Sequence, residues 1–363
     1  MRNPVPIFAV LLASTSVLVS GTELQQAVYW KKGQAAVQAN LSHFCEASQG
    51  IDIIPLAFLF QYGAPLVPGG NFGACNLTVK EAGPVSAACQ QVADDIKYCQ
   101  SQKKTILLSL GGAGGNYGLS NQSDAETLAQ ELWAMYGPVQ DEYTGPRPLG
   151  DVVIDGFDLD TENGVGAFAY YFLVWKLREL FATDQSRQYF LSGAPQCVVP
   201  DSNMGDMIFN APFDYLFIQF YNTPNCAARG EISGYLPEYG RNQYFSFDAW
   251  RQFTGISFSQ SSRAKLFIGL PSSAAAAGSA EEYLLSPDEA LELIDKFRNH
   301  DGFAGVMLWD AANSDANVID GCTYSQQISS ILHHGIKNIN VTFCCTSHLE
   351  TWFSARHALL SLI

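Results

Sequence analysis

The sequence predicts an α/β fold built on a parallel sheet. Two observations support this prediction: eight short apolar runs recur along the chain, and the longer segments between them carry helical periodicity. Because the runs are apolar at nearly every position, their strands should be buried on both faces, as parallel sheets require. Strands that alternate with helices form either a (β/α)₈ barrel or a doubly wound open sheet, and the pattern alone is compatible with both.

Each predicted element has its own local signal. A capping box predicts one helix from Ser123 to Tyr136, and another predicts a helix from Ser286, with Pro287 at its first position. Segment 168–181 is rich in aromatic residues, as expected for a helix that packs against a sheet. The predicted strands are 27–30, 53–60, 105–110, 152–158, 189–194, 215–220, 265–270 and 305–309.

Composition limits the possible function classes. Hydrophobic residues make up 47% of the 363 residues and charged residues only 15%, so the chain can bury a large core and is not disordered. The formal net charge of −15 argues against nucleic acid and anionic membrane surfaces as partners, because both are polyanions. This charge fits a soluble protein that acts on a neutral or cationic ligand.

The N-terminus is typical of a signal peptide, predicted to span residues 1–21. Arg2 supplies the positive charge, segment 7–19 is an apolar run too short to cross a membrane, and Gly21 ends a small-residue cleavage site. A buried first helix is the structural alternative. Nine cysteines and four Asn-X-Ser/Thr sequons fit an oxidising secretory route. We therefore expect a secreted, extracellular protein.

The rest of the chain is expected to form one catalytic domain over residues 22–334. Residues 335–363 form an extension of unknown role whose end is too short for a lipid-anchor signal. Nine is an odd number of cysteines, so at least one thiol lacks an intramolecular partner. Adjacent Cys344 and Cys345 make the extension the expected place for this anomaly.

The most informative segment is the run of carboxylates that ends at Glu162. Side chains alternate along a strand, so Asp158, Asp160 and Glu162 should share one face. Phe157 and Leu159 should share the other. Neighbours on one face lie about 6.5–7 Å apart, and crowding three acids in a partly desolvated site raises at least one pKa. A carboxyl that stays protonated near neutral pH is what general acid catalysis of glycosidic cleavage needs.

Two structural interpretations compete with this catalytic one. A metal site could use three carboxylates, but no histidine lies nearby in the sequence and a straight strand surrounds an ion poorly. A solvated acidic face is common on helices, but this run begins with three apolar residues and contains Phe157 and Leu159. We therefore expect the run to be functional.

The pattern Asp155-x-x-Asp158-x-Asp160-x-Glu162 resembles the signature of glycoside hydrolase family 18, and the similarity extends along most of the chain. It is closest to the plant and fungal class III chitinases of the hevamine type. The other segments that carry it are Tyr29-Trp30, Ser109-Leu110-Gly111-Gly112, Ala194-Pro195-Gln196-Cys197, 213–222 and 305–309. The resemblance implies a single (β/α)₈ TIM barrel and a secreted endochitinase that acts on chitin or chito-oligosaccharides, with no metal or organic cofactor.

The resemblance also implies a substrate-assisted retaining mechanism, in which the sugar's own 2-acetamido carbonyl is the nucleophile. Glu162 would protonate the leaving oxygen and then activate water. Asp160 would orient the acetamido N–H and stabilise the charged ring. Asp158 would share a proton or hydrogen bond with Asp160. Tyr221 would donate a hydrogen bond to the acetamido carbonyl and so fix it for attack.

Substrate-binding residues and disulfides follow from the same resemblance. Trp309 looks like the floor under the sugar before the cleaved bond, since sugar rings have apolar faces; ordinary barrel core is the alternative for Trp309 and Phe58. The further substrate-binding positions that it implies are Tyr29, Phe58, Gly111, Gly112, Gln219 and Asn222. The disulfides that it implies are Cys45–Cys99, Cys75–Cys89 and Cys197–Cys226.

The chain departs from the family pattern after its first strand. There, Lys31-Lys32-Gly33-Gln34 stands where the family has a shorter Gly-Gln-Asn turn. Two rival functions stay open. One is a non-catalytic chitin-binding lectin or glycosidase inhibitor, although such proteins typically lose the acid or a neighbouring aspartate. The other is an endo-β-N-acetylglucosaminidase or lysozyme-like hydrolase with the same chemistry. We expect a monomer that is extracellular or associated with a cell wall.

Overall fold

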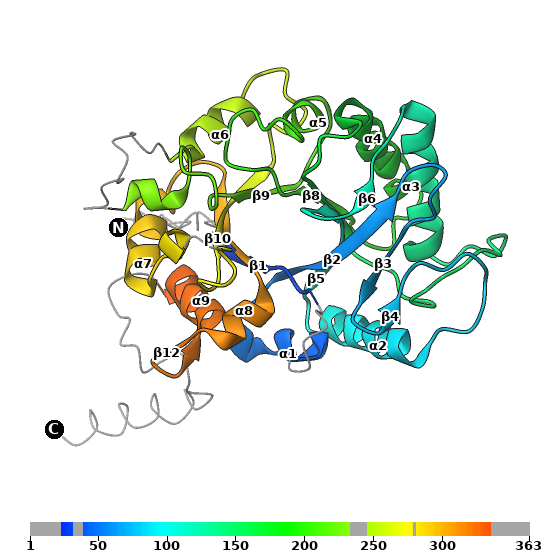
Figure 1. Cartoon of the computed structure of the whole chain (residues 1–363), viewed down its shortest axis with the longest axis horizontal. Helices are drawn as coiled ribbons and strands as arrows, with labels where there is room; N and C mark the ends of the chain where they lie inside the picture. The colour runs from blue at the N-terminus through cyan, green and yellow to red at the C-terminus, as the bar shows by residue number, and fades with distance from the viewer. Residues whose placement is uncertain (1–22, 32–38, 233–244, 279–280, 335–363) are drawn as a thin grey trace, which may run out of the picture.

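A computed structural model of the chain describes residues 23–31, 39–232, 245–278 and 281–334. The expected signal peptide and C-terminal extension lie outside these residues. Parallel strands form a ring that is surrounded by helices (Figure 1). Strand β1 pairs in parallel with both β2 and β11, which closes the ring into a barrel and rules out an open doubly wound sheet. The barrel strands are β1 (Gln25–Val28), β2 (Ile53–Tyr62), β5 (Thr105–Gly112), β7 (Gly156–Thr161), β8 (Phe190–Gly193), β9 (Tyr215–Gln219), β10 (Lys265–Pro271) and β11 (Phe303–Trp309).

Helices and short strands fill the connections between the barrel strands. The helices are α1 (Leu41–Phe44), α2 (Ala87–Ser101), α3 (Gln122–Tyr136), α4 (Tyr170–Phe181), α5 (Gly205–Asn210), α6 (Phe247–Thr254), α7 (Pro287–Phe297), α8 (Ala311–Ala316) and α9 (Tyr324–His334). The short strands are β3 (Gly69–Phe72), β4 (Cys75–Asn76), β6 (Asn116–Tyr117), β12 (Val318–Ile319) and β13 (Cys322–Thr323). No helix in the described ranges has the length and apolar character to cross a membrane.

The helix starts confirm one predicted capping box and correct the other. Helix α7 begins with the full box at Ser286, whose side chain accepts a hydrogen bond from the Glu289 backbone N–H. Helix α3 begins earlier than predicted, because the side chain of Asn121 caps it by accepting from the Asp124 N–H. Ser123 therefore lies inside the helix rather than at its N-cap.

The bounds of all eight barrel strands differ from the predicted ones by one to four residues, and the shifts of β7 and β1 concern the site most. Strand β7 begins at Gly156 instead of residue 152, because the Asp155 carboxylate turns back to accept from the Ile106 backbone N–H at 2.9 Å. Strand β1 ends at Val28, and Trp30 keeps only an isolated bridge to Leu56. These shifts leave the predicted order of strands and helices intact.

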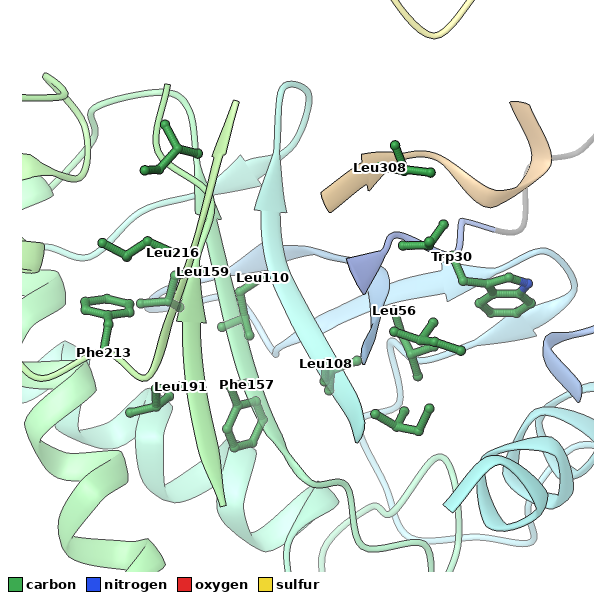
Figure 2. Close-up of a cluster of buried hydrophobic side chains, with 14 of the residues drawn as sticks. Trp30, Leu56, Leu108, Leu110, Phe157, Leu159, Leu191, Phe213, Leu216 and Leu308 are labelled. Carbon is green, nitrogen blue, oxygen red and sulfur yellow. The ribbon is translucent and has the colours of Figure 1, made fainter. Parts of the chain in front are cut away.

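The core forms two layers that are separated by the barrel wall. Alternate strand residues point outward and pack against the helices; Figure 2 shows Leu108, Phe157 and Leu159 in this outer layer. The other residues point into the barrel, where Tyr29 and Phe217 belong to the inner layer. Phe157 and Leu159 thus point away from the barrel interior, as the alternation predicted. The acidic positions between them point inward, toward the barrel end where all the parallel strands finish.

Candidate active site

Neighbouring strands set the surroundings of the carboxylate row. In the register between β5 and β7, Ser109 lies opposite Asp158 and Gly111 opposite Asp160. Asp158 and Asp160 belong to β7 itself, and Glu162 follows the last residue of the strand. The three carboxyls therefore rise from the barrel interior to its mouth, in the order in which they occur in the sequence.

Asp158 is the deepest acid and is fully buried. Its carboxylate accepts hydrogen bonds from Tyr29 Oη at 2.7 Å and from the hydroxyls of Ser109 and Ser192 at 2.6 Å each. Burial raises the pKa of Asp158, and the three hydroxyl donors oppose that rise because they favour the charged form. The three converging donors hold this carboxylate in place at the bottom of the row. Ser192, on β8, was not singled out from the sequence.

Asp160 and Glu162 form a coupled pair directly above it. Burial and then the charge of Glu162 raise the pKa of Asp160 well above its ordinary value, and the two carboxyls hydrogen-bond each other. Burial also raises the pKa of Glu162, while the hydrogen bonds from Asp160 and Gln219 oppose the rise. The pair therefore retains a proton at a pH where isolated carboxyls would be ionised.

Asp160 forms hydrogen bonds with residues that lie toward the mouth of the barrel. Its Oδ1 accepts from Gln219 Nε2 at 3.1 Å, and its second link is to Glu162. Asp158 accepts its hydrogen bonds from the hydroxyl donors of the layer below, and the expected sharing between Asp158 and Asp160 stays a prediction. Asp160 and Glu162 are thus the two acids of the row that hydrogen-bond each other.

A tyrosine that the sequence did not reveal holds the backbone of Glu162. The Tyr117 hydroxyl accepts from the Glu162 backbone N–H at 3.0 Å and donates to the Gly112 carbonyl at 2.7 Å. Burial is the main reason that the pKa of Tyr117 is raised to about 12, so the phenol stays protonated. Tyr117 thus joins the ends of β5 and β7 at the point where the row reaches the surface.

The row opens into a cavity of about 290 Å³. Its floor is aromatic: Phe58 and Trp309 stack with their ring centroids 5.7 Å apart. Tyr221 forms part of the wall, and burial raises the pKa of its hydroxyl well above the ordinary value, so it remains a donor. The lining residues are Lys31, Phe58, Gly112, Ala113, Gly114, Asp160, Glu162, Gln219, Tyr221, Asn222, Ala276 and Trp309.

Two of the predicted substrate-binding residues do not line this cavity. Tyr29 lies in the layer below, where its hydroxyl supports Asp158. Gly111 serves the close approach of two strands: its φ is +112°, and a Cβ there would lie 2.2 Å from the Asp160 carbonyl oxygen. Gly112 does line the cavity, and a Cβ on it would meet the Phe58 ring at 2.8 Å.

Two charged residues near the cavity were missed as site residues. Lys31, in the segment that departs from the family pattern, lines the cavity with its Nζ 5.7 Å from the centroid of the Trp309 ring. Asp201 is buried in the loop after β8, and its charge raises the pKa of both Asp160 and Glu162. Its carboxylate accepts from three backbone N–H groups, including that of Met204 at 2.7 Å.

Three disulfides tie the loops around the barrel, in the pairing that the resemblance implied. They are Cys45–Cys99, Cys75–Cys89 and Cys197–Cys226. The last joins the loops that follow β8 and β9, next to Tyr221. Cys344 and Cys345 lie outside the described residues.

Comparisons with known proteins agree with this geometry. A family model described as "Glycosyl hydrolases family 18" matches residues 25–292. The chain is 40% identical over 338 residues to "Endochitinase A1" of Aspergillus fumigatus, covering 90% of this chain but only 39% of that protein. It is 39% identical to "Endochitinase 2" of Metarhizium robertsii, covering 86% of this chain and 74% of that protein. The chain thus spans well under half the length of the Aspergillus relative.

Solved structures with the same fold include an enzyme and an inhibitor. The ICChI chitinase from Ipomoea carnea has a TM-score of 0.66 and 29% identity, with 85% of this chain and 99% of that chain covered. The xylanase and alpha-amylase inhibitor protein XAIP-II from Scadoxus multiflorus has a TM-score of 0.66 and 27% identity, with 84% and 97% covered. The shared fold therefore does not by itself separate catalysis from binding.

Proposed function

The chain belongs to family 18 of the glycosyl hydrolases, and we propose that it is a chitinase that hydrolyses β-1,4 bonds between N-acetylglucosamine units. One observation carries the proposal: Glu162, with a raised pKa, stands at the cavity wall beside Asp160 and above a fixed Asp158. The names of the fungal relatives support the substrate class.

Glu162 is the proton donor in this proposal. Its raised pKa keeps the acid form populated when the glycosidic oxygen needs a proton. As the bond between C1 and the leaving oxygen breaks, the proton moves from Glu162 to that oxygen. Glu162 is then a carboxylate, which can accept a proton from the water that attacks C1 in the second step.

The substrate supplies the nucleophile. In most retaining glycosidases a second carboxylate attacks the anomeric carbon, but Asp160 is already engaged by Glu162 and Gln219. The 2-acetamido carbonyl oxygen therefore bonds to C1 and forms an oxazolinium ion, with the acetamido N–H held by Asp160. Tyr221 donates to that carbonyl and aligns it for attack. Two inversions at C1 return a product with the starting β-anomer.

The aromatic floor supports this arrangement. A sugar ring that packs its apolar face on Trp309 and Phe58 would present C1 to the carboxyl row on the opposite side of the barrel, because β11 and β7 are four strands apart in the ring. Lys31 is the cation of the described cavity lining and offers a donor to sugar hydroxyls.

Secretion and a monomeric state are parts of the same proposal. Three disulfides support an oxidising compartment outside the cytosol. The formal net charge of −15 favours a soluble monomer over self-association and over nucleic acid or anionic membrane as partner.

The test compares the wild-type chain with Glu162→Gln on chito-oligomers, with the anomer of the first product followed by NMR. A matched control is Glu142→Gln, an exposed glutamate in the loop after α3. We expect β-anomer from wild type and control, and a loss of at least about 10³-fold in kcat for Glu162→Gln. Activity that survives in Glu162→Gln would refute the assignment of Glu162 as the acid. An α-anomer as the first product would refute the retaining mechanism.

The same preparation separates the rival functions. Release of intact glycans from a glycoprotein, or lysis of peptidoglycan, without chitin cleavage would favour the endo-β-N-acetylglucosaminidase or lysozyme-like alternative. Binding of chito-oligomers with no cleavage of any substrate would favour the lectin or inhibitor alternative, which the solved inhibitor structure keeps in view.

A further inference from the structure

The outer face of α4 is aromatic where a surface helix normally carries polar residues. Phe168, in the 3₁₀ turn before the helix, is 55% exposed, and Trp175 is 42% exposed. Tyr171 and Phe172 between them are half-buried, with their ring centroids 4.1 Å apart. We call these four residues the aromatic stripe. Figure 1 shows α4 on the outside of the barrel, beside α3 and α5.

The exposed rings of the stripe do not belong to the face with which α4 packs on the barrel, although Tyr171 and Phe172 pack in part against the outer core layer. A helix turns about 100° per residue, so Phe168, Phe172 and Trp175 follow one side of it. Val174 and Leu177 are fully buried and lie on the opposite side. The core therefore accounts for the buried side of α4 and leaves the exposed rings of the stripe unexplained.

The stripe begins at the catalytic end of the barrel. Phe168 lies six residues beyond Glu162, in the connection from β7 to α4. This connection is held in place: Asn163 Nδ2 donates to the Tyr117 carbonyl at 3.0 Å, and Asn163 Oδ1 accepts from the Val165 N–H at 3.0 Å. Val165 is itself 57% exposed. The connection that follows Glu162 thus carries two exposed apolar side chains, Val165 and Phe168.

Charge argues for a neutral occupant of this surface. The charged neighbours Lys176 and Glu179 pair with each other at 2.8 Å, so they add no net charge beside the rings. A second copy of a chain with a net charge of −15 would be repelled, and so would a polyanion. A polysaccharide of neutral sugars has apolar ring faces that pack on exposed aromatics and brings no charge.

We propose that the aromatic stripe is a second carbohydrate-binding surface, which holds a chain of insoluble chitin beside the cavity; the identity of that polysaccharide rests on the proposed function. The stripe extends about 10 Å from Phe168 to Trp175, since a helix rises about 1.5 Å per residue, which leaves room for more than one pyranose ring. Trp175 is already oriented, because its Nε1 donates to the Asn210 carbonyl at 2.9 Å. A pre-oriented ring loses little conformational freedom on binding.

The experiment compares adsorption to insoluble chitin with cleavage of soluble oligomers. The test variant is Phe168→Ala combined with Trp175→Ala, and the matched control is Tyr98→Ala, an aromatic residue 41% exposed on α2, a helix away from α4. Adsorption is measured in a Glu162→Gln background, so that the chitin is not consumed. We expect the double variant to adsorb about tenfold more weakly, with soluble-hexamer kcat/KM within twofold of wild type and the control unchanged in both.

Adsorption equal to that of the control would overturn the proposal. An equal loss of activity on soluble oligomers and of adsorption to insoluble chitin would also overturn it, since the rings would then act through the cavity. A wild-type dimer that sedimentation detects and that is lost in the double variant would overturn it as well. If the alanine pair lowers the Tm, Phe168→Ser with Trp175→Gln replaces it, because the glutamine amide can still donate to Asn210. If adsorption depends on the aromatic stripe but the wild-type chain cleaves no oligomer, the binding proposal is supported and the proposed function is refuted.

Discussion

Replacing Tyr117 with phenylalanine removes one hydroxyl that two neighbouring strand ends share. The hydroxyl accepts from the Glu162 N–H at 3.0 Å and donates to the Gly112 carbonyl at 2.7 Å. Phenylalanine keeps the ring and its stack on Tyr62, at a centroid distance of 5.1 Å, so no cavity is created. The change therefore isolates the loss of two hydrogen bonds.

The magnitude follows from the burial of the two groups. A buried backbone group left without a partner costs about 1–3 kcal/mol, and Tyr117 is only 5% exposed. Two such groups give about 2–6 kcal/mol, which lowers the Tm by about 3–9 °C for a domain of this size. Because Glu162 loses its backbone anchor, kcat should also fall about tenfold with KM little changed.

Calorimetry and steady-state kinetics on chito-oligomers measure both effects. The matched control is Tyr143→Phe, which removes a single 3.2 Å bond to the Pro146 carbonyl away from the cavity. This control should cost about 1 kcal/mol or less and leave kcat unchanged. A Tyr117→Phe protein with the Tm of the control and wild-type kcat would refute the idea that this hydroxyl positions Glu162.

Three further predictions concern charge and covalent links. Asp201→Asn removes a charge that raises the pKa of Glu162, so Glu162 should lose its proton at lower pH. The alkaline limb of the profile of kcat against pH should therefore move to lower pH. The control Asp206→Asn, at an exposed aspartate, should leave this limb where it is. The raised carboxyl pKa values at the end of β7 penalise the folded state when these groups are charged, so the Tm should rise from about pH 8 to about pH 5, and a Tm that falls over this range would contradict the burial argument. Opening the Cys45–Cys99 bridge by a double alanine change should cost about 4 kcal/mol, because the disulfide closes a loop of 54 residues; a denaturant titration that finds less than about 1 kcal/mol would contradict this.

Sequence patterns predicted the parts of the site that depend on local periodicity. Alternation along one strand placed Asp158 and Asp160 toward the barrel interior and Phe157 and Leu159 away from it, and the structure confirms this division. The predicted division of faces is correct although β7 begins four residues later than predicted. A period of two depends only on the parity of positions, so a shift of the strand boundary leaves the faces unchanged.

The residues that the sequence missed are those that act across strands. Ser192 reaches Asp158 because the register of β7 and β8 sets them opposite each other. Tyr117 reaches Glu162 over 45 positions of sequence separation. The sequence offered one signal for Ser192, which is a serine within an apolar strand. The acid that it contacts depends on the register between neighbouring strands, and local sequence patterns do not contain this register. Lys31 carried a signal as a departure from the family pattern, without indicating the cavity.

The carboxyl row is costly to the fold and useful to the chemistry for the same physical reason. Burial of Asp158, Asp160 and Glu162 disfavours their charged forms, and this raises the pKa values that general acid catalysis needs. The hydroxyls of Tyr29 and Ser109 offset part of the cost at the deepest acid and keep it an acceptor. Hydrogen bonds from Asp160 and Gln219 offset part of the cost at Glu162, whereas burial and the charge of Glu162 raise the pKa of Asp160 well above its ordinary value. The coupled pair of Asp160 and Glu162 therefore keeps a proton beside the cavity, where Glu162 passes it to the glycosidic oxygen in the proposed mechanism.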